Sequence, residues 1–185
     1  MSSSAPAHTE STPFALYPVT RSNSAQTVPA LLRLIKALAL YEQAPDAVEA
    51  TEELLHRALF GDEVEGGRKY AECVLAYTGG SPEEGGSAVG MAVYFYTFST
   101  WTGRGGLYLE DLFVEASMRG QGVGRALFRY LGTLCDELKL PRMDWVVLDW
   151  NTPAQDVYRR MGAVHKKEWW GMRLEGEALA KLARD

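Results

Sequence analysis

A glycine-rich turn between an apolar segment and an amphipathic helix constrains this chain more than any other feature. Residues 107–114 are typical of a strand, and residues 123–138 place apolar side chains at the three- and four-residue spacings of a helix. Between them, Gly120, Gly122 and Gly124 occupy alternate positions. Glycine lets main-chain N–H groups approach a ligand, and a helix begins with unpaired donors and the positive end of its dipole. This order of segments favours a layered α/β fold with an anion site at the turn.

The turn has two interpretations. One is a cradle for a pyrophosphate group, to which Arg119 and Arg125 add positive charge. The other is a tight structural turn, for which glycine is a common residue. Two familiar phosphate motifs do not fit, because the run lacks the closing Gly-Lys-Ser/Thr of a P-loop and Arg125 replaces the last glycine of a GxGxxG motif.

The rest of the chain predicts helices and strands around this centre. Strands are expected at residues 70–77, 88–98, 107–114, 143–150 and 169–174, and helices at residues 28–41, 52–59, 123–138, 151–161 and from residue 177. Pro29 is expected in the first turn of its helix, and Thr51 is expected to cap the next one. The continuous apolar character of residues 143–150 predicts burial on both faces. The predicted class is α/β or α+β, with one mixed sheet and layered helices.

Length and composition predict one domain at residues 13–185, because 185 residues suit one hydrophobic core. Residues 1–12, rich in Ser, Thr, Ala and Pro, are expected to form a flexible tail without a secretion signal. No apolar run suits a membrane span, and a net charge of −5 gives no basic face for nucleic acid. Two distant cysteines and three scattered histidines predict a reducing, cytoplasmic setting and no metal site.

Two adjacent carboxylates, Glu110 and Asp111, interrupt the apolar strand at residues 107–114. Neighbouring strand residues point to opposite faces, so one acid is expected to be buried unless a bulge re-aims it. A buried carboxyl group gains a raised pKa and can act as a base. A pair of hydrogen-bonded acids at the end of a sheet explains the same pattern.

Asn151 and Tyr158 belong to the helix expected at residues 151–161. Asn151 is a helix-capping residue, and Tyr158 is the only tyrosine on that helix. A phenol has an ordinary pKa of about 10, so it stays protonated at neutral pH and can act as an acid. A core aromatic with a hydrogen-bonded hydroxyl is the alternative. Trp101, in the loop before the acidic strand, either lines a substrate pocket or packs under that loop.

Together these segments resemble the GNAT superfamily of N-acetyltransferases. Arg119, Gly122 and Gly124 match its acetyl-CoA signature, in which Gln or Arg is followed at the third position by Gly and at the fifth by Gly or Ala. The chain is most similar to the spermidine/spermine and thialysine acetyltransferase branch, from about residue 28 to the C-terminus. The similar segments are residues 38–42, 99–101, 108–111, 119–124, 149–151, 158–160, 162–163 and 176–178.

The resemblance implies a GNAT-like mixed, mostly antiparallel sheet flanked by helices, acetyl-CoA as co-substrate, a small-molecule amine acceptor and a homodimer. It also implies that Glu110 accepts the amine proton through water and that Tyr158 protonates the departing thiolate. Four residues are expected at the acceptor: Glu42, Trp101, Glu110 and Asp111. The residues expected at the cofactor are Leu112, Phe113, Val114, Arg119, Gly120, Gln121, Gly122, Val123, Gly124, Arg125, Asn151 and Tyr158.

Two segments depart from that branch. Ser99 stands where polyamine-specific members carry an acid, and the chain is shorter between Ala163 and Trp169, where Lys166 and Lys167 occur. Positive charge there favours a short amine or an amino-acid side-chain amine over spermine. Two other functions stay open at this point: acetylation of a protein N-terminus or lysine, and CoA binding without catalysis.

Overall fold

The computed structural model describes residues 13–61 and 67–184. The chain divides into two compact units, Met1–Trp145 and Val146–Asp185. The first unit contains the sheet and helices α1 to α3, and the second contains α4 and α5. The tail predicted at residues 1–12 lies outside the described residues.

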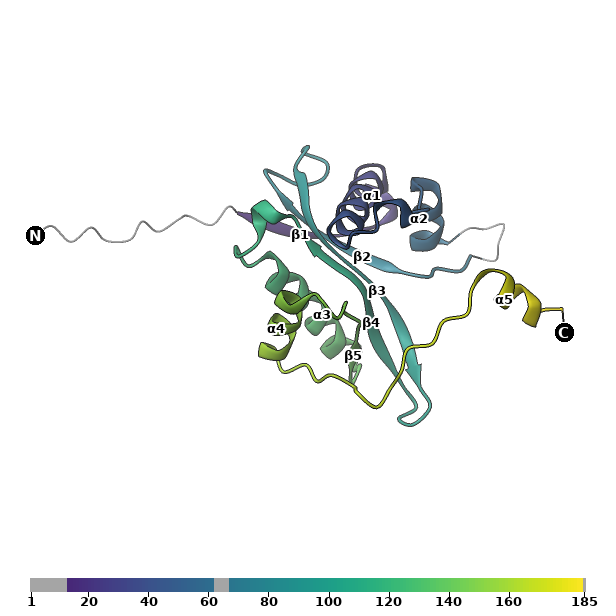
Figure 1. The fold of residues 1–185 in the computed structure, drawn as a ribbon. Coiled ribbons are helices and arrows are strands. Elements are labelled where there is room, and N and C mark those ends of the chain that lie inside the picture. The colour runs from purple at the N-terminus through teal and green to yellow at the C-terminus, as the bar shows by residue number, and fades with distance from the viewer. Residues whose placement is uncertain (1–12, 62–66, 185) are drawn as a thin grey trace, which may run out of the picture. The chain divides into compact units, whose positions relative to one another are not determined.

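A five-stranded sheet with strand order β1-β2-β3-β4-β5 forms the centre of the first unit (Figure 1). The first four strands pair antiparallel, and β5 runs parallel to β4. The mixed, mostly antiparallel sheet expected from the sequence is therefore confirmed. The strands are β1 (Phe14–Pro18), β2 (Glu72–Thr78), β3 (Ser87–Ser99), β4 (Arg104–Val114) and β5 (Met143–Asp144).

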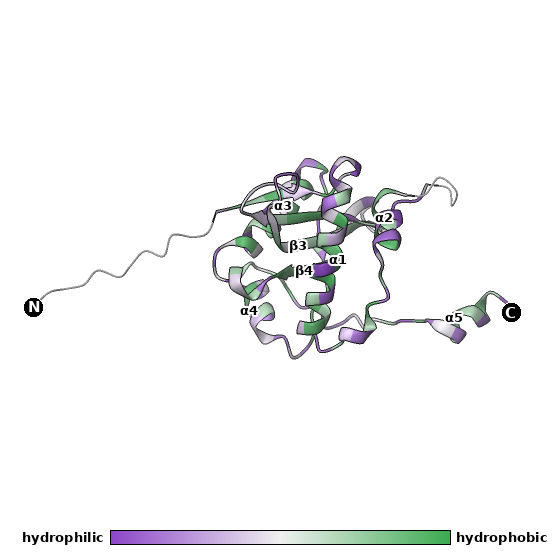
Figure 2. Ribbon diagram, turned by 90° about the horizontal axis from the view of Figure 1, so that it is seen from above, coloured by the Kyte–Doolittle hydropathy of each residue, from purple (hydrophilic) through white to green (hydrophobic). Residues whose placement is uncertain are grey.

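Helices cover both faces of this sheet (Figure 1). α1 (Ser24–Tyr41) and α2 (Glu52–Phe60) lie on one face, and α3 (Val123–Glu137) lies on the other. Short 3-10 helices occur at η1 (Arg21–Asn23), η2 (Pro45–Ala47) and η3 (Ala116–Met118). Seen from above, α1 carries both hydrophobic and hydrophilic colour, as an amphipathic helix should (Figure 2).

Each face of the sheet has its own apolar core. Leu31 and Leu34 of α1 pack with Leu75 of β2 on one side, while Leu127 and Leu131 of α3 are buried on the other. Burying a leucine fully stabilises a fold by about 2 kcal/mol. The two cores therefore fix α1 and α3 on opposite sides of β3 and β4, the strands that carry the candidate site.

The first two helices follow their predicted patterns with one correction. Thr51 caps α2 as expected, because its hydroxyl accepts the N–H of Leu54 at 3.2 Å. α1, however, begins at Ser24, so Pro29 lies inside the helix rather than in its first turn. The extra turn is anchored by the Thr27 hydroxyl, which donates to the Asn23 carbonyl at 2.9 Å.

Two strand predictions were wrong, and one strand was missed. β1 was not expected; it is short and is held by antiparallel pairing with β2, which local sequence does not show. The strand predicted at residues 143–150 is limited to Met143–Asp144, and the expected burial fails because Val146 is 76% exposed. Residues 169–174 form no strand.

The second unit contains α4 (Thr152–Arg160) and α5 (Gly176–Leu182). Asn151 caps α4 as predicted, because its side-chain oxygen accepts the N–H of Ala154 at 3.4 Å. Gly162, with φ of +91°, follows the helix in the left-handed conformation that favours glycine.

Candidate active site

A β-bulge at Glu110 sets the direction of both carboxylates on β4. Val93 of β3 pairs with Asp111, and the next residue, Tyr94, pairs with Leu109. The register therefore skips Glu110, which lies on the exposed side of the bulge. The structure therefore contains a bulge of the kind that, according to the sequence, could re-aim one of the two adjacent acids.

The bulge also exchanges the faces of β4. Leu107 and Leu109 belong to the core beneath α3, and beyond the bulge Leu112 and Val114 pack against that same core. Residues of β4 that face the α3 core have odd numbers before Glu110 and even numbers after it, because the bulge inserts one extra residue into the strand. Side chains at positions 111 and 113 therefore face the α1 side of the sheet.

Asp111 lies on this α1 side, in line with Val93 and Cys73 across three strands. Burial, the neighbouring Glu110 and then Glu42 raise the pKa of the Asp111 carboxyl from 3.8 to about 6. Burial, followed by the charge of Asp111, likewise raises the pKa of the Cys73 thiol. Cys73 is thus an inert core thiol, and Asp111 is a carboxyl group that a nearby cation would stabilise in its ionised form.

Glu42 reaches this region from the C-terminal end of α1. Its N–H caps the helix by donating to the Leu38 carbonyl at 2.9 Å, and burial raises the pKa of its carboxyl. The C-terminal end of a helix carries partial negative charge, which disfavours a carboxylate there. We call these three residues, Glu42, Glu110 and Asp111, the acidic cluster. Its negative charge suits an ammonium group.

The glycine turn has the backbone that a main-chain anion cradle needs. Gly120 and Gly122 have φ of +77° and +90°, and a Cβ at either would meet no heavy atom within 4 Å. These glycines are needed for conformation, and the space beside them is open. The Ala126 N–H donates to the Gly122 carbonyl at 2.9 Å, so the N–H groups before Ala126 are those that lack an intrahelical acceptor. The turn therefore combines open space with main-chain donors, as an anion site requires.

The long side chains of this turn fold back onto their own scaffold. The Arg119 Nε donates to the Val114 carbonyl at 3.0 Å, and the Gln121 Nε2 donates to the Ser117 carbonyl at 2.9 Å. The Arg119 guanidinium lies over the Tyr41 ring, 4.9 Å from its centre. The positive charge of Arg119, which the sequence predicted at the pyrophosphate cradle, is therefore directed toward α1.

The other residues expected at the cofactor divide into core and surface. The side chains of Phe113 and Val123 are buried, so only their backbone groups are available to a ligand, while Arg125 is exposed on the first turn of α3.

β5 pairs with β4 only at Leu107 and Tyr108. Within the described residues, β4 beyond Tyr108 has a strand on one side only, which leaves an edge for an extended ligand.

Trp101 lies apart from the acidic cluster within this chain. It occupies the tight turn between β3 and β4 and is 89% exposed. Asp111 follows Arg104, the first residue of β4, by seven positions, which corresponds to about 23 Å of extended strand. Within one chain, the structure does not bring this expected acceptor residue to the acids.

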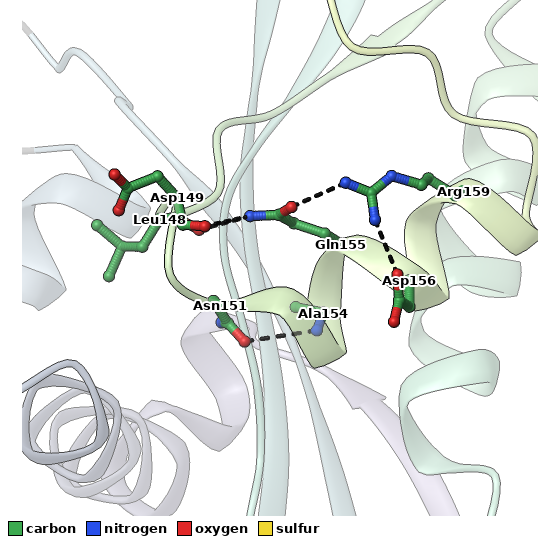
Figure 3. Close-up of polar contacts among 7 residues, drawn as sticks. All are labelled: Leu148, Asp149, Asn151, Ala154, Gln155, Asp156 and Arg159. Atoms are coloured by element: carbon green, nitrogen blue, oxygen red, sulfur yellow. Dashed lines mark hydrogen bonds and ion pairs between the residues drawn. The ribbon is translucent and has the colours of Figure 1, made fainter.

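In the second unit, Gln155 organises the turn that carries Asn151 (Figure 3). Its amide nitrogen donates to the carbonyls of Leu148, at 3.1 Å, and Asp149, at 2.8 Å. Its amide oxygen accepts from Arg159, at 2.9 Å. Sequence reasoning missed Gln155, although its position one turn after a helix cap is a signal for such a role.

Tyr158 follows Asn151 by seven residues along α4. Seven residues make nearly two full turns, so both residues lie on one side of this helix, about 10 Å apart along its axis. The Tyr158 carbonyl accepts N–H groups from Met161, at 3.1 Å, and Ala163, at 3.0 Å, which fixes the end of the helix.

The described residues show neither a membrane helix nor a metal cluster. None of their helices combines the length and apolar character that a bilayer span needs. Nor do they bring together three or more His, Cys, Asp or Glu side chains that could hold a metal ion.

This chain is similar in sequence to known acetyltransferases. Residues 36–163 match the model of the acetyltransferase (GNAT) family. A thialysine N-epsilon-acetyltransferase of Sus scrofa is 36% identical over 158 residues, which cover 83% of this chain and 89% of that protein. A spermidine/spermine N(1)-acetyltransferase-like protein 1 of Homo sapiens is 32% identical over 88% of this chain and 23% of its own length.

A solved structure agrees in fold. An integron cassette protein from the mobile metagenome of V. cholerae superposes with a TM-score of 0.72 at 26% identity, over 93% of this chain and 98% of that one. The family model spans most of the chain, including β2 to β4 and the glycine turn. Since sequence and fold agree over that length, this protein belongs to the GNAT family and is an acetyl-transferring enzyme.

Proposed function

We propose that this protein transfers the acetyl group of acetyl-CoA to a primary amine of a small molecule, namely a diamine, a polyamine or a lysine-like amino acid such as thialysine. The observation that carries the proposal is the bulge at Glu110, which sets Asp111 on the α1 side, within electrostatic reach of Glu42. The acidic cluster joins the end of α1 to β4, the strand that leads into the glycine turn, and so suits a cationic acceptor beside an anionic cofactor.

Members of the GNAT family use acetyl-CoA, which supplies the acetyl group as a reactive thioester. Main-chain N–H groups from Gly120 to Gly124 hold the diphosphate at the head of α3. Backbone groups of Leu112 and Val114, on the open edge of β4, hold the extended arm and the acetyl oxygen. A main-chain N–H aimed at that oxygen stabilises the negative charge that develops on it.

The acceptor arrives with a proton that it must lose. An alkyl amine has a pKa of about 10.4, so it is almost wholly protonated at neutral pH and cannot attack a carbonyl carbon. The acidic cluster attracts this cation, and Glu110 takes the proton through a water molecule. Glu110 suits this role because the bulge leaves it exposed beside the more buried Asp111.

Transfer then needs one acid. The amine nitrogen bonds to the acetyl carbon, the carbon–sulfur bond breaks, and Tyr158 gives its proton to the departing thiolate. Asn151, at the head of the same helix, contacts the cofactor. Family membership and the shared side of α4 support these two roles.

A short acceptor is favoured over spermine. Thialysine acetyltransferases align with 83% of this chain, and Lys166 and Lys167 add positive charge that disfavours a long polycation. We also expect the enzyme to be a cytoplasmic homodimer, as the resemblance implied.

A screen of acceptors tests the proposal. Thialysine, lysine, putrescine, spermidine, spermine and a histone peptide are each incubated with enzyme and acetyl-CoA, and acetylated product is measured by mass spectrometry. We expect the highest kcat/KM for thialysine, lysine or a short diamine. Acetylation of the peptide alone would identify a protein acetyltransferase instead. Acetyl-CoA binding without product from any of these acceptors would contradict the proposed acceptor class.

A further inference from the structure

Arg119 connects the cofactor turn to the end of α1, two regions that have separate roles in the proposed reaction. It directly precedes Gly120, where the cofactor turn begins, yet its side chain points away from that turn. Its Cζ lies 4.9 Å from the centre of the Tyr41 ring and 5.8 Å from the centre of the Phe113 ring. Its Nε is also bound to the Val114 carbonyl. A planar guanidinium that meets two rings and one carbonyl has a defined orientation.

Tyr41 connects this guanidinium to the acidic cluster. It is the last residue of α1 and packs, half-buried, against the same core as Phe113. The next residue is Glu42, whose charge contributes to raising the pKa of Asp111. One side of the α1 end therefore touches the cofactor turn through Arg119, and the next residue belongs to the acceptor region.

We propose that Arg119 is a positioning residue that couples acetyl-CoA binding to amine binding through Tyr41. A diphosphate on Gly120 and Gly122 orders the turn and holds Arg119 against the Tyr41 ring, which fixes the end of α1 and therefore Glu42. By thermodynamic reciprocity, an amine that fixes Glu42 strengthens acetyl-CoA binding by the same factor. The proposal rests on the proposed acetyl transfer, and it assigns the Arg119 side chain to the scaffold rather than to the diphosphate.

Substitutions at Tyr41 separate these two assignments, because Tyr41 lies on α1 and not in the turn. Acetyl-CoA affinity is measured by calorimetry for the wild type, Tyr41→Leu, Tyr41→Phe and, as a control on the same helix, Leu40→Ala, whose side chain is 68% exposed. Loss of the ring is expected to raise the acetyl-CoA Kd about two- to fivefold, the range of an exposed cation–π contact. Tyr41→Phe keeps the ring and should bind like the wild type, as should Leu40→Ala.

The double variant completes the test. In an Arg119→Ala background, Tyr41→Leu should have no further effect on the acetyl-CoA Kd, because the contact is already lost. An unchanged Kd in Tyr41→Leu, or effects of the two substitutions that simply add, would overturn the coupling. If Tyr41→Leu only destabilised the helix, it would lower the Tm in both backgrounds. The acetyl-CoA Kd would then stay unchanged at roughly 15 °C, a temperature well below unfolding at which the fold is intact. Failure of the proposed function is recognised separately, because the wild type itself would then give no heat with acetyl-CoA.

Discussion

Glu42, at the end of α1, interacts electrostatically with Asp111 of β4, although the two residues are far apart in the sequence. Burial, Glu110 and then Glu42 raise the pKa of the Asp111 carboxyl to about 6. An acid that is both buried and surrounded by negative charge costs stability at neutral pH. A protein keeps such a residue at the expense of stability when it serves a ligand of opposite charge.

Asp111→Asn tests this relationship through the pH dependence of stability. The folded-state pKa of about 6 lies above the ordinary value of 3.8, so the Asp111 contribution is fully present below about pH 4 and is lost as pH rises through 6. The substitution should flatten the free energy of unfolding between pH 4 and 7 and stabilise the protein at pH 7 by about 2 kcal/mol. Urea unfolding at several pH values measures this. Asp136→Asn, at a highly exposed side chain, is the matched control, and parallel wild-type and Asp111→Asn curves would refute the prediction.

Glu110→Gln tests the path of the amine proton. Without the carboxylate, the acceptor must lose its proton to solvent, which becomes favourable only near the amine pKa of about 10.4. The pH profile of kcat/KM should therefore move so that activity survives mainly at high pH. A profile that keeps its wild-type position would mean that another group or bulk water takes the proton.

Tyr158→Phe tests the acid that protonates the thiolate. Removing a positioned general acid lowers a rate by about 10²- to 10⁴-fold, whereas the phenyl ring preserves packing. We expect kcat to fall in this range while the acetyl-CoA Kd measured by calorimetry stays the same. Tyr70→Phe, at a side chain that is 64% exposed, should match the wild type. Wild-type turnover by Tyr158→Phe would remove this residue from the mechanism.

Gly122→Ala tests the backbone of the cradle. The φ of +90° at this position strains any residue with a Cβ, although no neighbouring atom obstructs that Cβ. The variant should bind acetyl-CoA roughly five- to thirtyfold more weakly, because a strain of about 1–2 kcal/mol opposes the backbone conformation that aims the N–H groups at the diphosphate. Gly132→Ala, in the middle of α3 with open space around it, is the control. It should keep the affinity and gain up to about 1 kcal/mol of stability; equal affinities in both variants would count against the cradle.

The helices and the glycine turn were predictable because their signals are local. α3 follows a periodic apolar stripe, and Gly120 and Gly122 adopt the positive φ for which glycine is the usual residue. Thr51 and Asn151 cap the helices that they were expected to cap. Each of these features depends on residues within a few positions of one another, so a single sequence contains the information.

The errors arose where pairing across the fold decides the structure. Residues 143–150 have the apolar run of a buried strand, but only Met143–Asp144 pair with β4. β1 exists because β2 offers it an edge, and its own five residues give no clear pattern. The geometry of the site could not be predicted from the sequence for the same reason. The bulge at Glu110 and the contact of Arg119 with Tyr41 depend on the register between distant segments.

Calorimetry with two ligands shows whether the glycine turn binds the diphosphate of acetyl-CoA. Acetyl-CoA contains the diphosphate, and S-acetylpantetheine carries the same thioester without the diphosphate and the 3′-phosphoadenosine attached to it. We expect one site per chain for acetyl-CoA and binding that is weaker by at least about 100-fold for S-acetylpantetheine, since charge-assisted hydrogen bonds contribute roughly 1.5–3 kcal/mol each. Equal affinity for the two ligands, or no heat with either, would contradict it.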